Sequence, residues 1–438
     1  MDTILSLTTP PDSAFARVLT TAAEALAQSR GLGKRESMRF QLAVEEFFTY
    51  LAQVAHEDCA IQTVLTGKPH QVCASLQFQA SGLCLGALNA SCTTSLDGAG
   101  EAANDLGLIL AGRVADRFRL TRDGEASFTL HAEVDKAYPA AKAPPSTVTF
   151  KPPYRAGLEH DPNRLMHAAA LAAARYPAWH CPASFQTPGK FADLVRAGQF
   201  TCVLALDGAS HPAGLLCWAK SGEKGLSFSG PFVFAPQEDA PQVARMLADA
   251  FLATVAREKI EIVFSERATQ DTPDGYFETL GTLTRYDEAG QSEQPVLYRH
   301  LREDMGETVW ADPALEDFLR GVYDRLAMCR DVLAAQPFGA SGPSERKRSL
   351  FSTTMDKGKG LAVLRPLLDG EDMAANLAGH VRVLSDKGFL NILLYMDLSQ
   401  AWEASLAGPV MDAGFKPRLV LPFAGRSDVA VFQYAPAR

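Results

Sequence analysis

The sequence predicts an α/β protein of the α+β kind, with helices and strands alternating through three successive segments. At 438 residues the chain is too long for one ordinary core. Apolar residues recur at helical spacing in some windows and form short strand-like runs in others. A stretch rich in Pro and Ala, residues 135–147, separates two regions of different pattern and is typical of a stiff linker. We therefore predict domains at 1–134, 148–304 and 305–438, with a linker at 135–147.

The first segment begins with a strand and two helices. Its predicted elements are a strand at 3–8, helices at 13–30 and 34–56, strands at 61–65 and 74–79, a helix at 101–116, and strands at 118–121 and 126–131. In the second helix, Glu46 and Tyr50 are four residues apart and therefore share a face.

Residues 39–50 of this helix carry a resemblance to a known family. They read Arg-Phe-Gln-Leu-Ala-Val-Glu-Glu-Phe-Phe-Thr-Tyr. This resembles the first nucleotide-binding box of the histidine-kinase-like (GHKL) ATPases, in the form found in bacterial anti-sigma factors. The resemblance covers the whole first segment and implies an α/β sandwich, with Glu46 in the place of the catalytic glutamate. Tyr50 stands where that family places a magnesium-binding asparagine.

The other two boxes of the family are also altered. The second box corresponds to residues 76–86, where Gly82 and Gly86 remain for a turn but the adenine-binding aspartate is missing. The third box corresponds to residues 104–110, where Gly107 remains for a phosphate-binding helix start. Asp105 adds a negative charge beside a triphosphate. We infer a scaffold that keeps the fold and has lost hydrolysis.

The middle segment has a different order: strand, two helices, three strands, helix, strand, helix, two strands. The ranges are a strand from 148, helices at 162–176 and 188–198, strands at 201–206, 213–219 and 226–234, a helix at 240–258, a strand at 260–264, a helix at 274–280, and strands at 283–286 and 295–300. Asp161-Pro162 and Thr187-Pro188 are predicted to cap the first two helices.

This order resembles the GNAT family of N-acetyltransferases, and Tyr276 to Gly281 is similar to that family's Tyr…Leu-Gly-Phe ending. The last segment repeats part of the pattern in shortened form, so we predict two GNAT-like mixed-sheet units in tandem. The last segment's elements are a helix at 313–335, strands at 349–355 and 360–364, a helix at 371–387, a strand at 390–396, a helix at 402–413, and strands at 419–423 and 429–434.

The GNAT resemblance implies a backbone cradle for the pyrophosphate of acetyl-CoA before the long helix. In the first unit Gln237 fits this cradle, but Glu238 and Asp239 follow it as two negative charges. Ala240 replaces a glycine there, and Pro241 removes an amide. In the second unit the cradle residues are Arg365 and Gly370, at a different spacing.

Tyr276 matches the tyrosine that many GNAT enzymes use as general acid toward the departing thiolate. A core-packing aromatic is the favoured alternative for this residue. The base stays open between Glu223, Glu261 and a water.

Composition excludes several function classes. A net charge of −9 and a pI near 5.6 argue against nucleic-acid binding. The eight scattered cysteines indicate a buried, reduced set. No signal segment or long apolar run is present, so we expect a cytoplasmic protein that does not bind membranes. No metal site is predicted, because His160 and His167 are separated by a helix start.

Two short motifs are given structural interpretations. We do not expect the adjacent His180 and Cys181 to form a nucleophile–base pair, and we expect residues 222–225 to form a hairpin turn.

The sequence therefore predicts a cytosolic regulatory or binding protein. The alternatives are an acyl-CoA-dependent N-acetyltransferase with a docking or sensing N-terminal domain, and an ATP-dependent switch of anti-sigma type. The cofactor stays open between acetyl-CoA and ATP. Acyl-CoA is one candidate partner, and a protein partner or a second copy bound through the N-terminal domain is the other.

Overall fold

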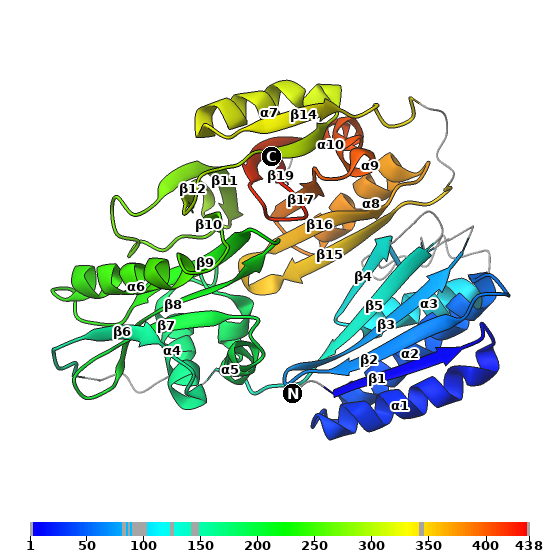
Figure 1. Ribbon diagram of the computed structural model, residues 1–438, viewed down its shortest axis with the longest axis horizontal. Helices are drawn as coiled ribbons and strands as arrows, with labels where there is room; N and C mark the ends of the chain where they lie inside the picture. Colours follow the sequence, from blue (N-terminus) through cyan, green and yellow to red (C-terminus); the bar gives the residue numbers. More distant parts are fainter. Residues whose placement is uncertain are drawn as a thin grey trace. The chain divides into compact units, whose positions relative to one another are not determined.

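The computed structural model describes residues 3–80, 85, 88–89, 103–122, 127–141, 149–340 and 346–435. The chain forms two compact units (Figure 1). The first comprises Met1–Ala137, Ser341–Thr354 and Val363–Gly388; the second comprises Tyr138–Ala340, Met355–Ala362 and Phe389–Arg438. The three predicted domain ranges remain a prediction.

The first unit is built on a five-stranded antiparallel sheet with the strand order β1-β2-β3-β5-β4. Helices lie against one face of this sheet (Figure 1). Its elements are β1 (Thr3–Thr9), α1 (Ala16–Ser29), α2 (Lys34–Val54), β2 (Ile61–Gly67), β3 (Gln71–Gln79), α3 (Ala103–Val114), β4 (Arg117–Arg122) and β5 (Ser127–Asp135). The elements predicted for this part of the chain are confirmed, with boundary shifts of a few residues.

Alternation explains why this sheet is covered on one face. Along β5, every second residue from Phe128 to Val134 is buried, and the residues between them are half-buried. Helix α2 buries Phe40, Phe47 and Phe48 against this sheet.

Residues from much later in the sequence complete the core of the first unit. Leu350 and Leu368 belong to the same buried cluster as the sheet and α2. The buried side-chain amide of Asn89 donates to the Ser349 carbonyl at 2.7 Å and accepts from the Phe351 N–H at 3.1 Å. Helix α8 (Met373–Asp386) also belongs to this unit.

The second unit contains a seven-stranded sheet with the order β11-β12-β10-β9-β8-β7-β6. The pair β9–β10 is parallel and the other pairs are antiparallel. The elements are β6 (Arg155–Leu158), α4 (Pro162–Arg175), α5 (Pro188–Arg196), β7 (Thr201–Leu206), β8 (Pro212–Ser221), β9 (Gly225–Val233), α6 (Ala240–Val255), β10 (Ile262–Ser265), β11 (Glu278–Asp287) and β12 (Gly290–His300).

Both faces of this sheet are buried. Cys202 and Leu204 of β7 pack in the cluster formed with α4 and α5, whereas Val203 and Ala205 pack in the cluster formed with α6. The Asp161 carboxylate caps α4 by accepting from two backbone N–H groups, as predicted. Thr187 precedes α5 but makes no side-chain capping bond.

Two predicted elements of this sheet domain are wrong. The first strand is β6, because residues 149–150 are irregular and Arg155 begins the pairing with β7. Residues 274–280 form no helix: turns run through Gly275, which has a φ of +77°, and β11 starts at Glu278. Phe277 stacks on Phe228 at a centroid distance of 4.7 Å, and this contact holds the turn against the sheet.

The remaining strands form two smaller sheets, one with the parallel pair β13-β14 and one with the order β15-β16-β17-β19-β18. Their elements are β13 (Glu307–Ala311), α7 (Pro313–Leu326), β14 (Arg330–Ala334), β15 (Leu350–Asp356), β16 (Leu361–Leu368), β17 (Asn391–Asp397), α9 (Ala401–Ala404), α10 (Ala407–Asp412), β18 (Phe415–Leu421) and β19 (Val429–Tyr434).

Two predicted helices of the last segment are also wrong in extent. The helix expected at 313–335 ends at Leu326, because Ala327 adopts a left-handed conformation with φ 51° and the chain then enters β14. The helix expected at 402–413 is two short helices, α9 and α10.

Two buried amide side chains close the free edge of β11. The Gln433 amide exchanges two hydrogen bonds with the backbone N–H and C=O of Thr284. The Asn391 amide does the same with the backbone of Tyr286, at 2.8 and 2.9 Å. Because an amide carries both a donor and an acceptor, each side chain replaces one residue of a neighbouring strand.

Among the helices that the structure describes, none is long and apolar enough to cross a lipid bilayer. Six cysteines fall in described residues and all are free thiols. Cys181, Cys202 and Cys217 are buried as expected, but Cys329 is exposed.

Candidate functional site

The turn before α6, where a phosphate cradle was predicted, carries the chain's own negative charge. Gln237 and Glu238 are exposed in this turn, and Asp239 is half-buried at the helix start. The Asp239 carboxylate accepts a hydrogen bond of 2.7 Å from the hydroxyl of Tyr154. Burial, and then the bond to Asp239, raise the pKa of Tyr154 to about 12, so the phenol keeps its proton at neutral pH. A carboxylate is therefore fixed at the residue that precedes α6, and it makes no capping hydrogen bond to the helix backbone.

The parallel strands β9 and β10 separate shortly after they begin. They pair over only three residues, Gly225–Ser227 opposite Ile262–Phe264, and β9 then continues to Val233. A parallel pair that separates in this way leaves backbone groups of β9 without a strand partner, and such groups are a potential binding edge for an extended ligand.

Side chains of this protein already bind several of those backbone groups. The Thr269 hydroxyl donates to the Pro231 carbonyl at 2.5 Å, and Thr269 is only 5% exposed. The Tyr176 hydroxyl accepts from the Val233 N–H at 2.6 Å and donates to the carboxylate of Asp271. Burial and this contact with Asp271 raise the pKa of Tyr176.

The next residue along the chain from β9 is held in the same manner. Arg175 donates to the Phe234 carbonyl at 2.7 Å, and its guanidinium lies over the Phe234 ring. The edge of β9 beyond the separation is thus occupied from inside the molecule. Sequence inspection missed these residues, because their partners lie 38 to 95 positions away along the chain.

Tyr276 lies on the solvent side of α6. Its hydroxyl donates to Asp249 at 2.7 Å, and this bond is the main cause of the raised pKa of the phenol. Asp249 is an exposed residue about 14 Å along the helix from Ala240, at 1.5 Å per residue. The structure therefore does not bring the Tyr276 hydroxyl to the start of α6, where Gln237 lies.

Glu46 and Gly107 are brought together in the first unit. Glu46 is half-buried on α2, and a Cβ added to Gly107 would lie 2.4 Å from its carboxylate oxygen. Burial, and then the neighbouring Glu45, raise the pKa of Glu46. Gly107 lies inside α3 rather than at its first turn, so its amide belongs to the helix ladder.

Tyr50 is 7% exposed and belongs to the buried cluster of the first unit. Tyr50 is therefore a core residue of this unit. Gly82 and Gly86 lie outside the described residues. The nucleotide-binding roles of Glu46, Gly82, Gly86 and Gly107 remain predictions.

Arg365 and Gly370 are separated by the packing around them. Arg365 is exposed on β16. Gly370 is buried, and a Cβ added there would lie 2.3 Å from the backbone nitrogen of Ser349 and 2.4 Å from the carbonyl carbon of Arg348. The space beside Gly370 is therefore filled by the protein's own backbone. The proposed roles of both residues in a CoA cradle remain predictions.

The other motifs have structural partners. His180 and Cys181 do not form a pair: the Cys181 thiol donates to the Ala172 carbonyl at 3.7 Å, and burial raises its pKa to about 11. Residues 222–225 form a turn between β8 and β9, as predicted. Within the described part of the chain, no group of three or more His, Cys, Asp or Glu residues is arranged to hold a metal ion.

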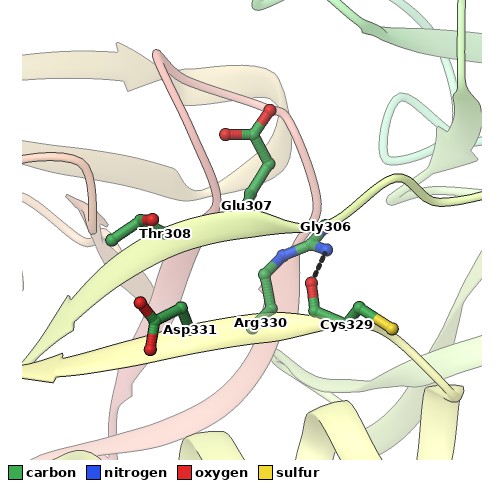
Figure 2. Close-up of a pocket in the computed structure, with 6 residues that line it drawn as sticks. All are labelled: Gly306, Glu307, Thr308, Cys329, Arg330 and Asp331. Carbon is green, nitrogen blue, oxygen red and sulfur yellow. Dashed lines mark hydrogen bonds between the residues drawn. The ribbon is translucent and has the colours of Figure 1, made fainter.

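Two hollows were not predicted from the sequence. The first lies at the start of the parallel pair β13–β14 and is lined by Gly306, Glu307, Thr308, Cys329, Arg330 and Asp331 (Figure 2). Its arginine is fully buried and donates to Asp304 and Asp428, at 2.6 and 2.7 Å. This charge is already neutralised, so the hollow is a poor anion site. The second lies between the loop after α4 and the turn that joins β15 to β16.

No family model matches the sequence, and no curated protein matches it. Over about a third of its length the chain is similar in structure to GNAT acetyltransferases. One is a putative acetyltransferase of the GNAT family from Desulfovibrio desulfuricans. The two sequences are 14% identical, the match covers 34% of this chain and 100% of that chain, and the TM-score is 0.27. Another is an aminoglycoside 6'-acetyltransferase type Ii, which is 12% identical. The match covers 34% of this chain and 97% of that chain, with a TM-score of 0.26. A third is a spermidine N-acetyltransferase from Vibrio cholerae, which is 11% identical. The match covers 34% of this chain and 94% of that chain, with a TM-score of 0.25. Likeness at this level says nothing about activity.

Proposed function

We propose that this is a regulatory or binding protein in which a degenerate GHKL-like domain is joined to GNAT-like units that do not transfer acyl groups. The observation that supports this most is the Asp239 carboxylate held by Tyr154 at the start of α6. A pyrophosphate there would meet Asp239 and Glu238 as like charges, and like charges at close range cost several kcal/mol.

The occupied edge of β9 supports the same proposal. An extended ligand that paired with β9 would have to displace Thr269 and Tyr176 from Pro231 and Val233. Each displaced hydrogen bond has to be replaced by the ligand, because a buried polar group left unpaired costs about 1–3 kcal/mol.

The N-terminal domain is proposed as the surface for a protein partner or a second copy. β1 is an edge strand of its sheet, and Ile4 on this strand is 62% exposed. Exposed edges pair readily with another strand. Light scattering after gel filtration tests self-association, and Ile4→Lys should weaken it.

The second candidate is an acyl-CoA-dependent N-acetyltransferase. One observation favours it: Tyr276 keeps its proton and is accessible, as a general acid must be. Its hydroxyl is nevertheless held by Asp249 on the outer side of α6.

Thermal shift with acetyl-CoA, CoA, ATP-magnesium and ADP in parallel separates these functions. A ligand at about 100 times its Kd stabilises a protein by about 2.7 kcal/mol. We expect no shift with any of the four ligands. A shift with acetyl-CoA, together with release of free CoA thiol on incubation with amines, would replace our proposal with the enzyme. A shift with ATP-magnesium that is lost in Glu46→Ala would favour the ATP-dependent switch.

A further inference from the structure

The hollow at the turn between β15 and β16 has a volume of about 260 Å³. One wall is formed by the loop after α4, and the opposite wall is the turn itself. The lining includes Ala178, Pro182, Asp356, Lys357 and Lys359. The pocket lies within the second unit, and none of its lining residues belongs to the turn before α6.

Lys359 brings a buried positive charge to this pocket. Its side chain is 7% exposed, and its ammonium donates to the Asp356 carboxylate at 2.8 Å. Burial, and then the charge of Arg267, lower the pKa of Lys359. An ammonium has three donors, and burying it is costly unless it is paired and hydrogen-bonded.

Positive charge exceeds negative charge around the pocket. Lys357 lines it and is exposed. Lys357 forms no ion pair with another residue that the structure describes, whereas Asp356 is the partner of Lys359. The pocket is therefore lined by two cations and one carboxylate, a net charge of +1.

The pocket suits a small ligand. At roughly 30 Å³ per water it has room for about nine water molecules, and it is smaller than the range of about 300–1,000 Å³ for drug-sized ligands. Ala178 and Pro182 add an apolar wall that fits a short carbon chain.

We propose that this pocket binds a small oxyanion, the carboxylate or phosphate group of a small molecule, through Lys359 and Lys357. This goes beyond the function proposed above and stands without it, because none of these residues belongs to the α6 turn or to the β9 edge.

The test measures binding of inorganic phosphate and of acetate to the full chain, by titrating each anion against the melting temperature at fixed ionic strength. The two anions distinguish a phosphate ligand from a carboxylate ligand. Lys357→Gln should weaken binding about tenfold, the loss of about one charge-assisted hydrogen bond. Asp356→Asn should tighten binding several-fold, because it removes the resident negative charge and keeps the shape.

Lys220→Gln is the matched control, since Lys220 is an exposed lysine elsewhere in the same unit. It should bind as the wild type does. Wild-type binding weaker than about 10 mM for both anions would overturn the proposal. Equal binding by the wild type and all variants would also overturn it and would mean an adventitious ion only. Failure here is separate from failure of the proposed function, because acetyl-CoA is not a probe in this experiment.

Discussion

Arg330 carries a buried charge whose removal should be costly. Its side chain and that of Asp428 are both 0% exposed, and Asp304 is 9% exposed. The guanidinium donates to both carboxylates and to the Cys329 carbonyl, at 2.6 to 2.8 Å (Figure 2 shows the last of these). It also lies 4.9 Å from the centre of the Phe423 ring.

Arg330→Met keeps most of the volume and removes the charge, so two carboxylates are left buried without their cation. Breaking a buried ion pair in this way costs about 3–5 kcal/mol, more than the pair itself contributes. Urea denaturation of the full chain at neutral pH, followed by the midpoint of the transition, measures this loss.

A second variant separates the charge effect from a packing effect. In Arg330→Met/Asp428→Leu one stranded carboxylate is also removed, so a double-mutant cycle should give a coupling energy of about 1–3 kcal/mol. Arg320→Met is the control: Arg320 is 54% exposed and pairs with Glu316 on the surface of α7, so its loss should cost no more than about 0.5 kcal/mol. A cost below about 1 kcal/mol for Arg330→Met, or additive effects in the cycle, would refute the reasoning.

Three further predictions concern stability. Gln433→Leu should lower the free energy of unfolding by about 1–3 kcal/mol for each of the two Thr284 backbone groups that lose their hydrogen-bond partner. Denaturant titration measures this loss, and a variant as stable as the wild type would contradict the role of Gln433 at the edge of β11. Gly370→Ala should lower the free energy of unfolding by about 1–3 kcal/mol, because its Cβ meets the backbone of Ser349. The control Gly321→Ala has open space around it inside α7 and should raise the free energy of unfolding by up to about 1 kcal/mol. Equal melting temperatures of the two variants would show that the space beside Gly370 is free. Glu46 has a raised pKa, so the folded state holds the proton of this carboxyl more tightly than the unfolded chain does. The free energy of unfolding of the wild type should therefore fall as pH rises from the ordinary carboxyl range through the raised pKa. Glu46→Gln should lose this slope and be relatively more stable at neutral pH, and identical pH profiles of the two proteins in urea denaturation would contradict the prediction.

The sequence predicted regular elements best where one period dominates. The alternation along β5 and the helical spacing of α2 are strong signals, and both elements were found. The strand β14 was missed because its five residues follow a helix and read as its continuation. Its place is fixed by the parallel pairing with β13 and by the ion pairs of Arg330, and both are long-range contacts.

The use of distant residues could not be read from local pattern. Leu350 and Leu368 look like ordinary strand residues, and only packing places them in the core of the first unit. At the candidate site, the charges of Glu238 and Asp239 were visible in the sequence, but the hydroxyl that holds Asp239 comes from Tyr154, 85 residues earlier. The pocket at Lys359 was missed because its lysines lie in a glycine-rich turn, which in sequence is typical of a solvated loop.

Calorimetric titration of acetyl-CoA into the full chain tests most directly whether the start of α6 and the edge of β9 are closed to this ligand. We predict no saturable binding at acetyl-CoA concentrations up to about 1 mM, which means a favourable binding free energy of less than about 4 kcal/mol. The double variant Glu238→Gln/Asp239→Asn, which removes both carboxylates, is the matched comparison and should bind more tightly than the wild type. Saturable micromolar binding by the wild type, displaced by free CoA, would contradict the proposal that this protein has lost acyl transfer.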